Sequence, residues 1–181
     1  MAKKFPSIGC CGIDCGLCPR FYTAGSSRCP GCGGEGFERK HPPCALKTCC
    51  ADRHNAEICS QCAEFQCQKY ADAEKIARDS FVTHAHIFKN HKMVQEIGFD
   101  AFMQLQAKRV LLLGKMLDEY DDGRSKGFFC LAAALLSLEN LEAAIDEMAS
   151  HDGDIRVKAA ALKSLLNKHA EAEGIALRLK K

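Results

Sequence analysis

The sequence has no apolar run long enough to cross a membrane. Its longest uninterrupted apolar stretch, Phe128 to Leu136, is far shorter than the ~20 residues that a membrane-spanning helix requires. Lys3 and Lys4 are followed by Pro6 and then by cysteines rather than by an apolar segment, so a secretory signal is not predicted. We therefore expect a soluble, cytoplasmic protein with no membrane contact.

The 181-residue chain also has little excess charge and no recognised catalytic motif. Its 25 Lys and Arg against 23 Asp and Glu leave a net charge of +2, which favours neither nucleic acid nor an acidic membrane as a partner. A P-loop, a dinucleotide fingerprint, G-x-S-x-G and H-E-x-x-H are all absent. The sequence therefore indicates no reaction, and we expect neither catalytic nor organic-cofactor-binding residues.

Cysteine is the residue that the chain has in excess. Twelve of the thirteen cysteines lie between Cys10 and Cys67, and only Cys130 lies outside. In a reducing compartment such a cluster indicates metal binding rather than disulfides. Residues 1–67 are also rich in Gly and Pro and lack a sustained helical period, so they need cross-links to fold. We predict an irregular, metal-bound cysteine-rich module over residues 1–67.

Three C-x2-C pairs within this module carry the metal prediction, since two thiolates at that spacing can share one tetrahedral ion. The predicted ligands are Cys11, Cys15, Cys18, Cys29, Cys32, Cys44, Cys49, Cys50, Cys59, Cys62 and Cys67. Cys10 is set aside because adjacent cysteines seldom ligate one ion, and for the same reason Cys49 and Cys50 compete. Eight ligands would close two sites and twelve would close three. Two ions are preferred, and spacing alone does not determine the pairing.

The spacing leaves the metal open between zinc and an iron–sulfur cluster, because both accept four thiolates. Cys11-x3-Cys15-x2-Cys18 has the spacing of radical S-adenosylmethionine enzymes, but no barrel-sized α/β region follows it. The Cys29-Pro30-Gly31-Cys32-Gly33 turn is typical of a zinc knuckle. Zinc is therefore the predicted cofactor, and an iron–sulfur cluster is the alternative.

These motifs resemble those of one known family. The pattern from Cys11-Gly12-Ile13-Asp14-Cys15 through Cys29-Pro30-Gly31-Cys32 and Cys44 to Cys59-Ser60-Gln61-Cys62 and Cys67 is similar to that of the DUF3795 family of bacterial and archaeal proteins. The run from Asp121 to Cys130 looks like a longer-chain branch of it. The resemblance implies metal binding without an established activity. Gln66 departs from the pattern, since the family usually has Pro there.

Residues 68–181 are predicted as a helical domain, so the fold class is mainly α with the cysteine-rich module packed on it. We expect helices from about Ser60 to Asp79, from Asn90 to Gly98, from an N-cap at Asp100 to Tyr120, from a cap at Ser125 to Leu136, along the apolar stripe from Leu138 to Met148, and from a cap at Asp154 to Gly174. A short strand over 175–179 is an alternative ending. Cys130 is expected to be a buried, inert thiol.

The histidines and one loop add further candidates. His41 and His54 could each replace a cysteine ligand, and His84, His86 and His91 could form a site of their own. The loop at Asp121–Arg124 is read as a solvated turn, with a ligand contact as the alternative.

Three functions are compatible with these predictions. The first is a structural zinc protein that presents a partner surface as an interaction module. The second is an iron–sulfur or thiol-redox protein. The third is a zinc-knuckle nucleic-acid binder, which is disfavoured because residues 1–67 carry only eight Lys and Arg against six Asp and Glu.

Overall fold

The computed structural model describes residues 3–74 and 79–180. Within these ranges the regular structure is helical and no strand is formed, which confirms the mainly α prediction. The α-helices are α1 (Ala45–Lys47), α2 (Gln68–Glu74), α3 (Ile87–Ile97), α4 (Phe99–Tyr120), α5 (Lys126–Leu135), α6 (Leu138–Glu147) and α7 (Ile155–Ala172). None of the described helices is both long and apolar enough to cross a membrane.

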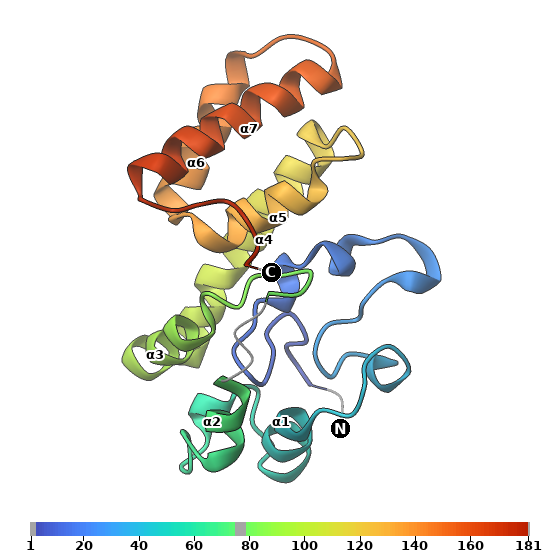
Figure 1. Ribbon diagram of the computed structural model, residues 1–181, viewed down its shortest axis with the longest axis vertical. Helices are drawn as coiled ribbons and strands as arrows, with labels where there is room; N and C mark the ends of the chain where they lie inside the picture. The colour runs from blue at the N-terminus through green and yellow to red at the C-terminus, as the bar shows by residue number, and fades with distance from the viewer. Residues whose placement is uncertain (1–2, 75–78, 181) are drawn as a thin grey trace.

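The cysteine-rich part is built almost entirely of short turns, as its Gly, Pro and Cys content predicts. Besides α1 it contains 3-10 turns at Cys15–Leu17, Pro19–Tyr22, Gly25–Ser27, Phe37–Arg39 and Cys59–Gln61, and a π-helical turn at Thr48–Arg53. Figure 1 shows this part with α1 and α2 towards one end of the molecule, and α6 and α7 towards the other.

The main hydrophobic core lies among α4, α5, α6 and α7. Leu113, Phe129, Leu141 and Leu162 are all fully buried in it, and they come from these four helices in turn. Leu17 of the cysteine-rich part belongs to the same core and is 1% exposed. The cysteine-rich part therefore contributes a buried side chain to the main core.

A second apolar cluster holds the N-terminal segment against α3 and α4. Ile8, Ile58, Val94 and Phe102 are buried in it. Because its N-terminal half packs against this cluster and its C-terminal half against the main core, α4 buries Phe102, Leu113, Met116 and Tyr120. The helix therefore packs on two sides.

The predicted caps hold in different degrees at three helices. The Asp154 carboxylate accepts hydrogen bonds from two backbone N–H groups in the first turn of α7, as predicted. Asp100 is not the N-cap of α4, because the helix already begins at Phe99. Ser125 is the N-cap residue of α5, as predicted, but its side chain makes no capping hydrogen bond, and its hydroxyl donates to Asp122 at 2.5 Å instead. The Asp121 and Asp122 carboxylates thus accept hydrogen bonds from backbone N–H groups and the Ser125 hydroxyl of their own loop.

The first predicted helix, Ser60 to Asp79, is wrong over its first eight residues. A 3-10 turn ends at Gln61, further turns follow, and α2 begins only at Gln68, while residues 75–78 lie outside the described ranges. Gln66 has φ 71°, a left-handed conformation that interrupts a helix and that proline cannot adopt. The departure from the family pattern at this position therefore has a structural consequence. The predicted strand at 175–179 is likewise not formed, and Ile175 and Leu177 pack against the main core instead.

Candidate metal centre

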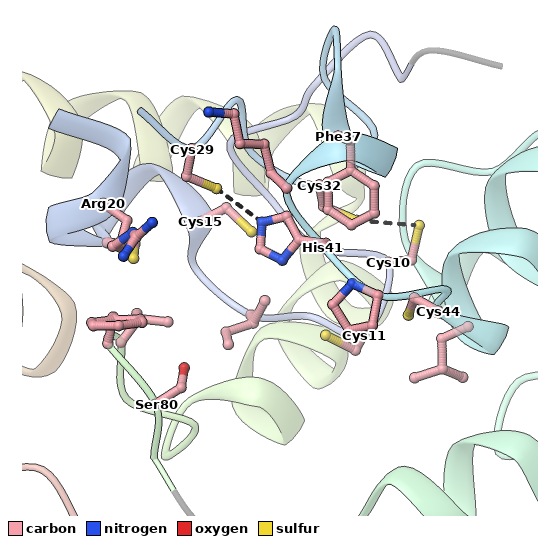
Figure 2. A pocket seen from close by; sticks show the side chains of 18 of the residues that line it. Cys10, Cys11, Cys15, Arg20, Cys29, Cys32, Phe37, His41, Cys44 and Ser80 are labelled. Atoms are coloured by element: carbon pink, nitrogen blue, oxygen red, sulfur yellow. Dashed lines mark hydrogen bonds between the residues drawn. The ribbon is translucent and has the colours of Figure 1, made fainter. Parts of the chain in front are cut away.

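The clustered cysteines line two cavities. The larger, of about 800 Å³, is lined by Cys10, Cys11, Cys15, Cys18, Cys29, Cys32 and Cys44, together with His41 (Figure 2). The smaller, of about 20 Å³, is lined by Cys49, Cys50, Cys59, Cys62 and Cys67, with His54 and Glu64. All eleven predicted ligands thus face one cavity or the other, and so does Cys10. The cysteines of residues 10–44 thus line one cavity and those of residues 49–67 the other.

A row of four thiols joins the two cavities. The Cys32 and Cys10 sulfurs lie 4.0 Å apart, Cys10 also hydrogen-bonds to Cys50, and Cys50 to Cys59. Figure 2 shows the first of these contacts on the wall of the larger cavity. Cys10 had been set aside as a spare thiol because it adjoins Cys11. The structure places it instead at the centre of the row, 1% exposed.

The first cysteine loop, residues 9–18, is held in place by α3. The Asn90 side-chain amide donates to the Gly12 carbonyl at 2.9 Å and to the Asp14 carboxylate at 2.8 Å. His91 Nε2 lies 2.9 Å from the Cys11 carbonyl oxygen. These contacts span more than 70 residues of sequence. The predicted histidine cluster therefore has another role at His91, which positions a cysteine loop.

Asp14 is a buried carboxyl within this support. It is 3% exposed, and burial raises its pKa to about 7, although nearby Arg109 and the Asn90 amide both act to lower it. The Asn90 amide satisfies one of its oxygens. Asp14 therefore fixes the turn between Cys11 and Cys15 rather than presenting a ligand to the cavity.

His41 is the histidine best placed to act with cysteine. Its Nε2 lies 3.2 Å from the Cys29 sulfur, and its ring stacks on Phe37 with centroids 4.5 Å apart. Burial lowers the pKa of His41, so its ring is neutral at physiological pH, which is the form that binds metals. The sequence-based prediction that His41 could replace a cysteine ligand is compatible with this position.

Burial favours the protonated thiols of Cys10, Cys11 and Cys15 in the absence of a cation. It raises the pKa of Cys11 to about 11 and that of Cys15 well above the ordinary value. At Cys10 the hydrogen bond with Cys32 lowers the pKa, but the bond with Cys50 and burial outweigh it and the value is about 12. A metal that binds here must displace these protons, which couples its affinity to pH.

Lys3 supplies positive charge inside the site. It is 8% exposed, its ammonium donates to the Ile8 carbonyl at 2.5 Å, and it acts to lower the pKa of Cys10, Cys15 and Cys32. A buried cation of this kind offsets the negative charge of bound thiolates. No signal in the sequence distinguishes Lys3 from other N-terminal lysines, so pattern reasoning missed it.

The donor atoms, thiols and an imidazole, are the types that zinc prefers. The distances between the sulfurs fit a zinc site less well. A tetrahedral zinc with Zn–S bonds of about 2.3 Å separates its sulfurs by about 3.8 Å, and the Cys10–Cys32 distance of 4.0 Å is close to this. Within residues 3–74 and 79–180, however, no three His, Cys, Asp or Glu side chains converge closely enough to hold an ion. Only the Cys10–Cys32 pair is thus shown near tetrahedral spacing among the described residues, and completing a site requires further side chains to turn inward.

Cys130 lies apart from both cavities. It is 1% exposed within the main core, and burial raises its pKa to about 12. This confirms the prediction of a buried thiol.

No known protein-family model, curated protein or solved structure matches this chain.

Proposed function

We propose that this is a metal-binding protein whose cysteine-rich part is organised by two metal sites, one at each cavity, with zinc as the metal. The observation that carries the proposal is the partition of the twelve clustered cysteines between two cavities. Each cavity has at least the four thiols that a closed zinc site requires. The motif resemblance to the DUF3795 family is compatible with metal binding. We also propose that the chain belongs to that family.

The smaller cavity is the candidate for a closed structural site. Its volume of about 20 Å³ is close to that occupied by a single water molecule, so it suits one ion and no further ligand. Four of its five cysteines would fill a tetrahedron, and the row of thiols makes Cys50 and Cys59 a plausible pair within it. Such a site contributes on the order of ~10 kcal/mol to folding.

The larger cavity would hold the second ion with thiolates from its wall. Cys10 joins the ligand candidates there, because it lies at tetrahedral spacing from Cys32. Cys29 and His41 form a second donor pair across the cavity. The helical part would then act as a rigid support that presents an interaction surface, with no reaction assigned to it.

A second candidate is an iron–sulfur or thiol-redox protein, and one observation favours it. Seven cysteines surround a cavity of about 800 Å³, a space that exceeds the need of a single ion and accommodates a multinuclear cluster. Both metals bind cysteine thiolates, so the donor set is the same in the two proposals. They differ in colour, because a cluster absorbs visible light and zinc does not.

The test is elemental analysis of protein purified without air, with the metal-to-chain ratio measured for two variants. We expect about two zinc ions per chain in the parent and about two in the control Cys130→Ala. About one is expected in the double variant Cys59→Ala with Cys62→Ala, because it leaves only three thiols at the smaller cavity. A brown preparation that contains iron would favour the iron–sulfur cluster over zinc. Absence of stoichiometric metal, or unchanged circular dichroism and thermal stability after chelation, would sink the proposal.

A further inference from the structure

The larger cavity has far more room than a metal ion needs. At about 800 Å³ it falls within the roughly 300–1,000 Å³ of cavities that bind small organic molecules. The neighbouring cavity of about 20 Å³ shows in the same molecule what a site of ionic size looks like. An ion held on the cysteine wall would leave most of the larger cavity open to another occupant.

Apart from its thiols, the described wall of this cavity carries positive charge and no carboxylate. Among the described residues that form its wall, Arg20, Lys40 and Lys69 carry positive charge and none is Asp or Glu. The Lys40 ammonium is bonded to the Ser26 carbonyl oxygen. The Arg20 guanidinium lies 4.9 Å from the centroid of the Phe81 ring, an aromatic side chain that is 60% exposed. The lining therefore attracts an anion and offers it an aromatic surface.

Apolar groups cover much of the remaining wall. Phe37 stacks on His41, and Ile13, Leu46 and Val82 also face the space. Figure 2 shows Arg20 at one side of the cavity, Cys10 and Cys44 at the other, and the His41 ring between them. A molecule that spans this distance would have its charge near Arg20 and its apolar body against His41 and Phe37.

We propose that the larger cavity is a binding site for a small organic anion with an aromatic or aliphatic body. Arg20, with Lys69, attracts the anionic head, and the apolar wall formed by Phe37, Phe81 and Val82 receives the body. Binding would bury apolar surface that is otherwise left facing solvent inside the cavity. The proposal rests on charge, volume and lining. A zinc ion held by four thiolates would add a net charge of about −2 to the cysteine wall, so the anionic head is placed at the Arg20 side of the cavity, away from Cys10 and Cys44.

The probe for this site is 8-anilino-1-naphthalenesulfonate, an aromatic anion whose fluorescence rises on binding. Its uncharged counterpart, N-phenyl-1-naphthylamine, has the same aromatic body without the sulfonate. Titration of each into the protein as purified, without removing metal, separates attraction to charge from apolar burial. We expect the sulfonate to bind at least about tenfold more tightly, and its affinity to fall as salt rises because salt screens the cationic lining.

Three variants locate the binding. Arg20→Gln is expected to weaken the sulfonate about threefold to tenfold and to leave the uncharged probe unchanged, while Arg20→Lys retains most of the affinity. Ser80→Trp, which places a large ring at the wall of the cavity, is expected to weaken both probes. Lys108→Gln, an exposed lysine outside the cavity lining, is the matched control and should change neither.

Equal affinity for the two probes, or no effect of Arg20→Gln and Ser80→Trp, would overturn the proposal, as would failure of the sulfonate to bind. The same samples are assayed for metal content and circular dichroism. If the protein contains metal and is folded but does not bind the sulfonate, the result counts against the anion site alone. Absence of metal with normal probe binding counts against the metal proposal alone.

Discussion

Replacing Gly12 by alanine is expected to destabilise the protein by about 2–5 kcal/mol, and the structure supplies two parts of this cost. Gly12 has φ 91°, where an L side chain costs about 1–2 kcal/mol. A Cβ atom there would also lie 2.8 Å from His91 Nε2 and 2.9 Å from the Ile87 carbonyl oxygen. Overpacking of this kind adds about 1–3 kcal/mol, because neither a buried ring nor a helix backbone moves freely.

Gly25→Ala is the matched control for the backbone part. Gly25 has φ 70°, and nothing lies within 4 Å of an added Cβ, so only the conformational cost of about 1–2 kcal/mol applies. The difference between the two variants therefore measures how tightly α3 packs on the first cysteine loop. His91→Ala in the Gly12→Ala background should recover part of the loss, with a coupling free energy of about 1 kcal/mol or more.

The assay is urea denaturation followed by circular dichroism, with the same excess of zinc in every sample so that metal binding shifts all variants alike. If Gly12→Ala and Gly25→Ala lower the free energy of unfolding by the same amount, the contact between α3 and the loop is not a stabilising one. A zero coupling free energy with His91→Ala would lead to the same conclusion.

Three further predictions concern the helical part. Arg109→Met should lower the free energy of unfolding by about 2–4 kcal/mol, because the guanidinium donates to two backbone carbonyls at the end of α5 at 2.8 and 2.6 Å; Arg109→Lys should recover part of this, and equal losses would contradict the reasoning. Asp154→Ala should cost about 0.5–2 kcal/mol in thermal denaturation, through loss of the α7 N-cap, and an unchanged Tm would refute it. Burial lowers the pKa of His86 to about 4, whereas the unfolded chain binds this proton near pH 6.5; stability should therefore fall as pH drops from about 6.5 to 4, by about 1–2 kcal/mol after allowance for partial exposure. Denaturation at stepped pH should show His86→Gln flattening this slope, and the exposed control His151→Gln leaving it unchanged.

The helices of the second half follow from local sequence, which is why most of them could be predicted. Asp154 caps α7 and apolar periodicity marks α4 and α6, and these signals act within a few residues. The long helix predicted from Ser60 failed because periodicity does not report a single residue in a left-handed conformation, here Gln66.

The cysteine site could be predicted in composition but not in arrangement. Spacing identified the eleven candidate ligands, all of which face a cavity. It set Cys10 aside on adjacency to Cys11 alone, whereas both side chains line the larger cavity. It also had no access to Asn90 and Lys3, whose roles arise only when segments far apart in the chain are brought together.

The support that α3 gives to the first cysteine loop also sets an order of events during synthesis. Asn90 and His91 leave the ribosome about 80 residues after the loop they hold, at a rate of about 5–20 residues per second. For several seconds the nascent chain therefore exposes closely spaced thiols without the hydrogen bonds that fix their loop. Until the middle of the chain has emerged, the loop of residues 9–18 therefore has only its local contacts to define its conformation.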